Sequence, residues 1–523
     1  MMSDLARLRA IVLAGVFVFC LDGAVHAQLV VWEQTVAHSV SGPDGVFARR
    51  GGALATMTGG VWVSGALAGD AGPLDQNLVI QSFGPGPVNS SLDLYDGGGS
   101  QSLDRGMGLG LLSDGGLVTT GRSEPEADRG GIVLIRYLSD GTRSWVRTIE
   151  PAGAGEYMEP LRPIVDLFDN IYVFARVRYV SPVKDEVLIA QYDAAGVKQW
   201  ETRFVDANAF DGSTYGVEAD ISYVDDVLYF VGNVLHTSDM KRRMILYSVD
   251  PVSGVVSARL GFSPGSFLGL DAVDLVVASS GDVFLLGEMV LAGERDVYLA
   301  RIKPSILPSL PTGALPLRYL SPGTTETAYR LVVDLQDNLY VLANTRTVSP
   351  LGNRSLLLLS YTNSGAQRWE RRYNVGDSIG SDLAYDPVLD QIYLTGSIGT
   401  AGGSDLIAQA YNASDGRPVW NYRYGGNAGG QDMGVSVAFD AGGSAFVVGV
   451  VENLGSGPDL FAARLQAWYR TADLNQDFAV GGLDLAQLLS MYGQTGAGIL
   501  EDLDTSLAVD QGDVLYLLEH YGD

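Results

Sequence analysis

The fold is most evident in residues 404–449, SDLIAQAYNASDGRPVWNYRYGGNAGGQDMGVSVAFDAGGSAFVVG. An apolar run (405–412) is followed by a Gly-containing turn, a second run led by Trp420, a third run (435–439) and a fourth that ends at Gly449. Short runs rich in apolar and β-branched residues, separated by turn residues, are typical of antiparallel strands. The segment therefore predicts four consecutive strands joined by tight turns.

The last of these runs belongs to a pattern that recurs along the chain, an apolar run ending in Gly or Ala. Its eight copies are VWVSG (61–65), LVTTG (117–121), IYVFA (171–175), LYFVG (228–232), VFLLG (283–287), LYVLA (339–343), IYLTG (392–396) and AFVVG (445–449). Consecutive copies end 53 to 57 residues apart. Such a period indicates stacked or radially arranged units, each too small to bury its apolar face alone.

Each repeat contains three further strand-like runs. One precedes the pattern, as in LVVDLQDN (331–338), and another follows it after a polar loop, as in DLIAQAYN (405–412). The fourth is usually led by a tryptophan, and these are Trp145, Trp200, Trp369 and Trp420. Four short strands per unit are typical of one β-propeller blade. We expect the recurring indole to pack between neighbouring blades, because a large ring there buries the face that one unit leaves exposed.

The eighth repeat lacks a fourth strand, and an isolated strand at the other end of the chain can supply it. LVVWEQTVA (29–37) carries Trp32 and precedes the first full unit. Pairing it with the last three strands would close the ring and remove two exposed sheet edges. The predicted fold is therefore all-β, an eight-bladed β-propeller over residues 28–467 with seven continuous blades and one shared blade. A seven-bladed ring with one irregular unit is the alternative.

The repeats resemble the bacterial β-propeller repeat family known as SBBP. The likeness covers residues 29–466 and is strongest in 404–449, with its Asp-Leu strand (405–406), its Gly-containing turn and its Trp420 strand ending near Gly425 and Gly426. The resemblance implies a fold and leaves the function open, because propellers have many functions.

The pattern changes after Ala467, where two acidic loops each precede an apolar run of helical period. DLNQDFAVGGLD (473–484) precedes LAQLLSMYG (485–493), and DLDTSLAVDQGD (502–513) precedes VLYLLEHYG (514–522). Oxygen ligands at alternate positions of a twelve-residue loop, with a carboxylate at the twelfth, are the pattern of an EF-hand calcium site. The candidate side-chain ligands are Asp473, Asn475, Asp477, Asp484, Asp502, Asp504, Ser506, Asp510 and Asp513, and the backbone carbonyls of Ala479 and Ala508 would complete the loops.

This tandem arrangement resembles a dockerin type I module over residues 471–523. Asp stands at the twelfth position of both loops, and Val480 and Val509 occupy the aliphatic eighth position. Phe478 and Leu507 stand where the family has Gly. The resemblance implies one or two bound Ca²⁺ ions and docking onto a cohesin-like or other extracellular protein, often in polysaccharide-degrading assemblies.

The N-terminal sequence predicts where the protein is located, and the net charge excludes one class of partner. Arg7 and Arg9 precede an apolar core (10–20), and Val25 and Ala27 fit a signal peptide (1–27) cut after Ala27. We therefore expect a secreted protein, extracellular or associated with the cell surface, with no membrane span. The formal charge of −27 argues against nucleic acid, because phosphate binding requires clustered Lys and Arg.

No catalytic constellation stands out. Only four histidines occur, and His38, His236 and His520 lie in unrelated segments, which argues against a Ser–His–Asp triad or a His-rich metal site. A pair of carboxylates could still meet in the central funnel, but the sequence does not say which. The polar loops after the second strand of each unit, such as 122–131 and 233–243, would gather on one face, where propeller ligands usually lie.

Four functional hypotheses remain, the last of which is a purely structural role in the cell envelope. The first is a secreted, non-catalytic propeller that binds a protein or glycan and carries a calcium-dependent docking module. The second is an extracellular polysaccharide-active enzyme, a hydrolase or lyase, with the same module. The third is a quinone-dependent dehydrogenase-like propeller. The sequence favours the first, with no catalytic residue and no cofactor other than calcium.

Overall fold

The computed structural model describes residues 29–36, 53–55, 60–68, 76–84, 92–97, 104–126, 129–209, 212–222, 224, 226–262, 268–291, 294–303, 317–319, 321, 323–348, 352–426, 428–440, 443–454, 457–466, 482–495 and 508–519. Within these ranges the chain is almost entirely β-structure, with two short helices. The all-β prediction is therefore confirmed. The predicted signal peptide (1–27) lies outside the described residues.

The first four repeat units begin after the N-terminal strand. Unit 1 comprises β2 (Ala53–Ala55), β3 (Val61–Ala68), β4 (Gln76–Phe83) and β5 (Leu92–Tyr95). Unit 2 comprises β6 (Arg105–Leu111), β7 (Leu117–Glu126), β8 (Arg129–Tyr137) and β9 (Arg143–Ile149). Unit 3 comprises β10 (Glu156–Pro160), β11 (Ile164–Val165), β12 (Ile171–Val180), β13 (Val183–Tyr192) and β14 (Lys198–Phe204). Unit 4 comprises β15 (Tyr215–Ser222), β16 (Val227–Leu235), β17 (Arg242–Val249) and β18 (Val256–Phe262).

The remaining units repeat the same meander. Unit 5 comprises β19 (Gly269–Val277), β20 (Val283–Val290), β21 (Arg295–Ile302) and β22 (Leu317–Arg318). Unit 6 comprises β23 (Thr324–Val333), β24 (Leu339–Thr347), β25 (Ser355–Tyr361) and β26 (Gln367–Tyr373). Unit 7 comprises β27 (Ser378–Asp386), β28 (Gln391–Gly399), β29 (Ser404–Asn412) and β30 (Pro418–Tyr424). Unit 8 comprises β31 (Met433–Phe439), β32 (Ser444–Asn453), β33 (Gly457–Gln466) and β1 (Leu29–Val36).

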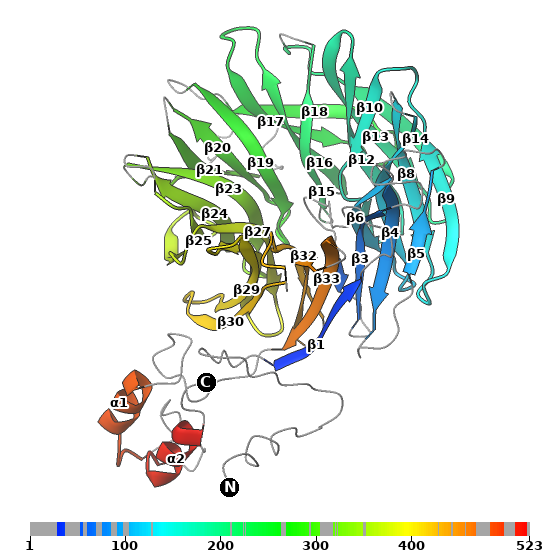
Figure 1. Cartoon of the computed structure of the whole chain (residues 1–523). Coiled ribbons are helices and arrows are strands. Elements are labelled where there is room, and N and C mark those ends of the chain that lie inside the picture. Colours follow the sequence, from blue (N-terminus) through cyan, green and yellow to red (C-terminus); the bar gives the residue numbers. More distant parts are fainter. Residues whose placement is uncertain are drawn as a thin grey trace.

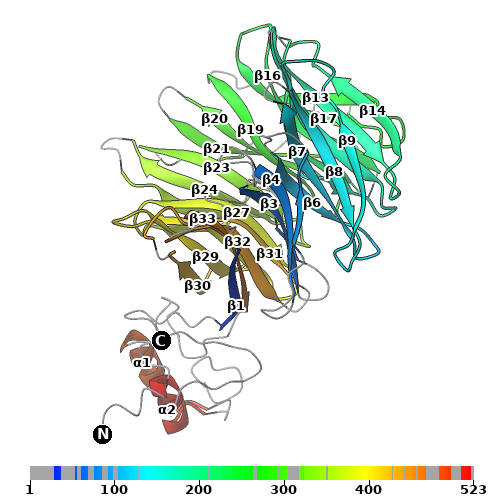
Figure 2. The same ribbon diagram turned by 45° about the vertical axis from the view of Figure 1, so that its right-hand side comes forward.

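Strand β1 joins the last unit, although it is the first strand of the chain. It pairs antiparallel with β33 from Leu29–Gln466 to Val36–Leu460. Figures 1 and 2 show these two strands side by side, so the two ends of the strand-rich region meet. The predicted pairing of the N-terminal strand with the last three strands is present in the structure.

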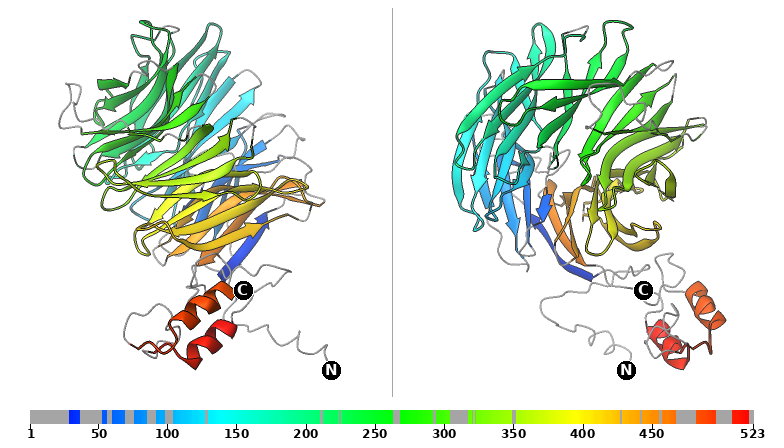
Figure 3. Two further views of the ribbon diagram at one scale, coloured as in Figure 1. Left: turned by 90° about the vertical axis from the view of Figure 1, so that its left-hand side faces the viewer. Right: turned by 180° about the vertical axis from the view of Figure 1, so that it is seen from behind.

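The units form six hydrogen-bonded sheets. Four sheets have four strands each, and two larger sheets arise because one parallel residue pair joins units 2 and 3 (Tyr157–Gly130) and another joins units 4 and 5 (Arg242–Gly269). All other strand pairs in these sheets are antiparallel, as hairpin connections require. Figure 3 shows the sheets side by side around a common centre.

The hydrophobic core lies between the units. Eight clusters of buried apolar side chains each combine residues of two units that follow one another along the chain, or of the first and last units. The cluster that contains Val63 and Val79 of unit 1, for example, also contains Phe446 and Leu460 of unit 8. Burying one such side chain contributes about 1.5–3 kcal/mol. Each unit is therefore stabilised mainly through its neighbours.

The four recurring tryptophans pack between neighbouring units, as predicted, and three of them also donate a hydrogen bond to the following unit, whereas the buried indole N–H of Trp420 has no acceptor among the described residues. The indole N–H of Trp145 donates to the carbonyl of Ala194 (3.1 Å), that of Trp200 to Pro251 (3.0 Å) and that of Trp369 to Ala413 (3.0 Å). Each acceptor lies in the turn before the fourth strand of the following unit. The tryptophans therefore have a structural role between sheets.

A glycine in one of these turns provides a test of this packing. Gly416 has a φ of +72°, and a Cβ there would lie 2.6 Å from the Trp369 ring. We expect Gly416→Ala to lower the free energy of unfolding by about 2–4 kcal/mol, through backbone strain and a steric clash. Gly429 is the matched control, because its φ is +64° but a Cβ would meet nothing within 4 Å. Equal losses for the two variants in urea denaturation would contradict this role for Trp369.

Candidate functional site

A β-bulge at the same place in most units positions a set of side chains at the centre of the molecule. The register of the first strand in a unit shifts between Gly106 and Gly108, Gly216 and Glu218, Ala272 and Asp274, Ala328 and Arg330, Gly380 and Asp382, and Gly434 and Ser436. In unit 3 the same strand is interrupted between β10 and β11, where Arg162 lies. A bulge redirects the residue that follows it, so these positions can point towards one another.

Three carboxylates from three units meet the guanidinium of Arg330 in this centre. Arg330 lies 3.1 Å from Asp382, 3.6 Å from Asp274 and 4.0 Å from Glu218. The three carboxylate side chains are at most 6% exposed. Burial alone would lower the pKa of Arg330, but these carboxylates outweigh that effect and raise it above its ordinary value. One cation therefore pairs with carboxylates from units 4, 5 and 7.

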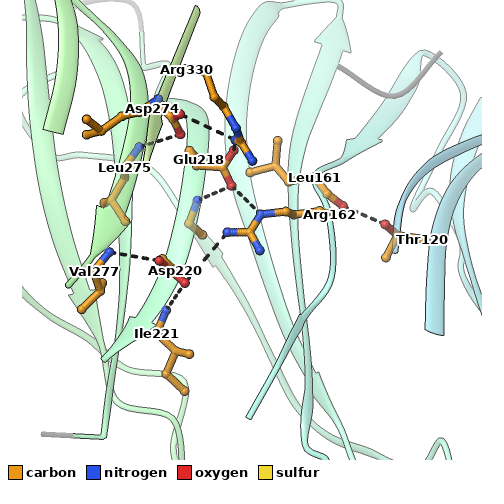
Figure 4. Close-up of polar contacts among 12 residues, drawn as sticks. Thr120, Leu161, Arg162, Glu218, Asp220, Ile221, Asp274, Leu275, Val277 and Arg330 are labelled. Carbon is orange, nitrogen blue, oxygen red and sulfur yellow. Dashed lines mark hydrogen bonds and ion pairs between the residues drawn. The ribbon is translucent and has the colours of Figure 1, made fainter. Parts of the chain in front are cut away.

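A second arginine extends this arrangement towards unit 3. Arg162 lies 3.5 Å from Glu218 and 3.9 Å from Asp220. Figure 4 shows Glu218 between the guanidinium groups of Arg162 and Arg330. Burial raises the pKa of Asp220, although Arg162 and two backbone N–H groups oppose the shift. Arg162, Glu218, Asp220, Asp274, Arg330 and Asp382 are called the central charge cluster below.

The carboxylates of this cluster also join consecutive units through the backbone. Asp274 accepts the N–H of Leu331 in the next unit (2.8 Å), and Asp382 accepts that of Val437 (3.1 Å). Asp220 accepts the N–H of Val277 in the same way (3.0 Å; Figure 4). A charged acceptor makes such bonds stronger than a neutral one would. The cluster thus fixes neighbouring units to one another.

A cavity of about 950 Å³ begins at this cluster and extends across units 2 to 4. Its lining combines many basic side chains with few acidic ones. The lining residues are Arg105, Met107, Arg122, Glu159, Pro160, Leu161, Arg162, Arg176, Tyr215, Gly216, Val217, Glu218, Asn233, Leu235 and Arg242. Five arginines thus face two glutamates, in a chain whose net charge is −27.

The arginines of the cavity are held in place by neighbouring side chains. Arg176 donates to Asp185 (2.6 Å) and stacks over the Tyr215 ring at 4.8 Å. Arg122 pairs with Glu124, and Arg242 lies 3.3 Å from Asp271. Arg122, Arg162 and Arg176 each have two carboxylates within 4 Å, and each guanidinium has five N–H donors, so some donors remain for a ligand. The lining therefore presents guanidinium N–H groups that can donate hydrogen bonds to an anionic group.

The sequence prediction about the loops agrees with this geometry in part. The segments predicted as loops, 122–131 and 233–243, do contribute Arg122, Asn233, Leu235 and Arg242 to the lining, but the structure places these residues in strands β7, β16 and β17 and not in loops. The central charge cluster, in contrast, was not predicted. The sequence does contain a signal, because Glu218, Asp274 and Arg330 interrupt apolar strands at intervals of 56 residues. Charged residues at the repeat period indicate positions that meet at the centre of a ring.

The candidate calcium ligands lie only partly within the described residues. Asp473, Asn475, Asp477, Ala479, Asp502, Asp504 and Ser506 lie outside them. Asp484 and Asp513 are the third residues of α1 (Gly482–Ser490) and α2 (Gln511–Glu519), and both are fully buried. Figures 1 and 3 show the two helices side by side, and Leu488, Val509 and Leu517 pack between them.

The two helices begin three residues earlier than the apolar runs predicted. At α2 the reason is a reciprocal cap, because the N–H of Gly512 donates to Asp510 (2.7 Å) and that of Asp510 donates to Asp513 (2.7 Å). The twelfth-position carboxylates therefore lie in the first helical turn. All predicted donors are oxygen atoms, and two equivalent buried carboxylates suit two equivalent Ca²⁺ sites, so the residues fit this ion.

Apart from the candidate calcium ligands, the described residues give no sign of a metal site or of a catalytic histidine. No group of three or more His, Cys, Asp and Glu side chains in these ranges could hold a metal ion. His236 contacts Ser238 at 2.9 Å on the surface, and His38 and His520 lie outside the described residues. Among the described helices, none is long and apolar enough to cross a membrane.

Comparisons with known proteins find similarity only among solved structures. No family model and no curated protein matches the chain. The polysaccharide lyase Uly1 is 11% identical, with a TM-score of 0.44 over 69% of this chain and 89% of the lyase. Sqt1 from Chaetomium thermophilum is 12% identical, with a TM-score of 0.45 over 83% of this chain and all of Sqt1. The WD40 domain of SCAP from fission yeast is 9% identical, with a TM-score of 0.39 over 86% of this chain and 97% of that domain. At these TM-scores we draw neither family nor function from the similarity.

Proposed function

We propose that this protein is a secreted, eight-bladed β-propeller that binds an anionic ligand in its arginine-lined cavity without transforming it. The single observation that carries the binding function is the lining itself, in which five arginines face two glutamates although the whole chain has a charge of −27. Clustered guanidinium groups in a concave site focus positive potential and favour carboxylate or sulfate ligands.

The blade count rests on the eight strand units and on the eight apolar clusters between them. The cluster shared by units 1 and 8, together with the pairing of β1 with β33, supports a closed ring. The SBBP-like repeats of residues 29–466, within the predicted propeller domain 28–467, agree with this architecture.

Binding assays with the full chain test the proposed ligand class. Acidic oligosaccharides, acidic peptides and their neutral counterparts would be titrated into the protein by calorimetry at low and high salt. We expect binding of anionic ligands only, with an affinity that falls as salt screens the charges. Equal binding of neutral and acidic counterparts, or no binding of any anion, would exclude this function.

The central carboxylates favour binding over catalysis. Glu218, Asp274 and Asp382 are ion-paired with Arg330, so they neutralise a buried cation and are not positioned as a free acid–base pair. The polysaccharide-active and quinone-dependent alternatives stay hypotheses, which activity on a polysaccharide panel and quinone reconstitution would test.

We also propose that residues 471–523 form the calcium-dependent docking module of this protein. The carboxylates of Asp484 and Asp513 would bind Ca²⁺ from the first turn of each helix. A cohesin-like or other extracellular protein is the proposed partner.

Calcium titration of the full chain checks this assignment. The wild-type protein is expected to bind one or two Ca²⁺ ions, and Asp484→Asn/Asp513→Asn is expected to bind them at least about tenfold more weakly, because each substitution removes a charged ligand. The exposed Asp415→Asn serves as the control, since Asp415 pairs only with Arg417 in a surface turn. The wild-type protein is also expected to capture an extracellular partner in the presence of calcium and to release it when a chelator is added. Unchanged calcium affinity in the double variant would contradict the assignment.

A further inference from the structure

A second cavity of about 430 Å³ lies between units 5 and 6. Its lining is again rich in arginine, with hydroxyl and amide groups between the charges. The lining residues are Val290, Leu291, Glu294, Arg295, Thr325, Thr327, Tyr329, Asn344, Thr345, Arg346 and Arg354. Three arginines and one glutamate line this cavity, and Arg295 and Arg354 also pair with Glu288 and Asp377.

The two cavities adjoin each other through one carboxylate. Asp271 lies 3.3 Å from Arg242, which lines the first cavity, and 3.8 Å from Arg295, which lines the second. Arg242 and Arg295 are also the first residues of β17 and β21, the third strands of units 4 and 5, so both stand at the same end of equivalent strands. The arginines of both cavities therefore lie on one surface across units 2 to 6, interleaved with the carboxylates that pair with them.

We infer that this surface binds a linear acidic polysaccharide, with anionic groups of one chain in both cavities. This inference rests on the proposed anion-binding function and specifies its ligand. The hydroxyl and amide groups of Thr325, Thr327 and Asn344 suit a ligand with many hydroxyls, which an acidic peptide lacks. The chain's overall charge of −27 opposes a nucleic acid duplex, which carries about one charge per 1.7 Å of its axis.

The two arginines chosen for the test line the second cavity without neutralising a buried acid. Arg346 is exposed, and Arg354 is 40% exposed and pairs with Asp377, which is 40% exposed as well. Hydrogen bonds from Arg354 lower the pKa of Asp377, as expected for a surface pair. Replacing both arginines by Gln should thus change the cavity's charge and leave the fold intact, which urea denaturation of the variant verifies.

The experiment compares short and long acidic oligosaccharides on the full chain. Oligogalacturonates of two residues and of ten or more residues would be titrated into the wild-type protein, Arg346→Gln/Arg354→Gln and the surface control Arg417→Gln. We expect the wild type and the control to bind the long oligomer about tenfold or more tighter than the short one, because binding in one cavity raises the effective concentration at the other. The double variant should lose this advantage of length and still bind the short oligomer.

Three other outcomes would show whether the two-cavity polysaccharide site fails alone or whether anion binding fails as well. A length advantage that persists in the folded double variant would overturn the two-cavity site. Binding of poly-glutamate but of no acidic oligosaccharide would overturn the ligand class and leave an anion-binding propeller. Failure of every anionic probe would remove the proposed function as well.

Discussion

Replacement of Arg330 by Met is expected to lower the free energy of unfolding by about 3–5 kcal/mol, as removal of one partner from a buried charge network does. The substitution keeps most of the side-chain volume but removes the cation that faces Glu218, Asp274 and Asp382. These carboxylates are almost completely buried and come from three different units, so their repulsion would act between units. Urea denaturation at neutral pH measures the loss.

The same variant should gain stability relative to the wild type as the pH falls. Burial already raises the pKa of Asp220, and the same desolvation acts on the carboxylates that Arg330 no longer neutralises. A carboxyl group that holds its proton more strongly in the folded state adds stability at low pH, which is lost as the pH rises through its folded-state pKa. The destabilisation is therefore expected to be smaller near about pH 5 than near about pH 8.

The wild-type contribution of Arg330 itself should not vary over that range. Its pKa is raised above the ordinary arginine value, so the stability it provides is lost only when the pH rises to strongly alkaline values. Arg417→Met is the matched control, because Arg417 is 56% exposed and its partner Asp415 is 47% exposed. The expected loss there is at most about 1 kcal/mol. A loss of that size for Arg330→Met, equal at both pH values, would contradict the role of the central charge cluster.

Neutralising two arginines of the larger cavity should weaken binding of an acidic ligand by about 100-fold or more, at roughly 1.5–3 kcal/mol for each hydrogen bond to a charged group. Arg122→Gln/Arg242→Gln is the informative variant, because both residues line the cavity, Arg122 from β7 of unit 2 and Arg242 from β17 of unit 4. Gln keeps a hydrogen-bonding amide but removes the charge. Calorimetric titration with the best acidic ligand of the binding panel measures the change.

Salt dependence distinguishes a charge effect from a disturbed fold. The wild-type affinity should fall with ionic strength, and the residual affinity of the double variant should fall less steeply, because fewer charges remain to be screened. Arg417→Gln, which removes a surface arginine from unit 7, should bind as the wild type does. An unchanged affinity in the double variant, with unfolding as in the wild type, would mean that the ligand binds elsewhere.

The prediction of strands succeeded because each unit obeys local rules. Alternating apolar runs, Gly-containing turns and a tryptophan at one position define hairpins without reference to distant residues. The same pattern indicated that Trp32 belongs to a strand missing from the last unit, and β1 does pair with β33. Helix onset was less accurate, since the cap formed by Asp510 and Asp513 begins α2 before its apolar run.

The repeat period of the sequence thus predicted an all-β chain of similar units. The two acidic loops predicted which residues would bind calcium. The sites themselves arise from contacts between units far apart in sequence. Arg330 reaches Glu218, which lies in β15 and is separated from it by 112 residues, because bulges turn both side chains towards one centre. Asp271 likewise joins Arg242 and Arg295 across units. Hydrophobic periodicity is a property of neighbouring residues, whereas the balance of buried charge depends on which strands the folded ring brings together.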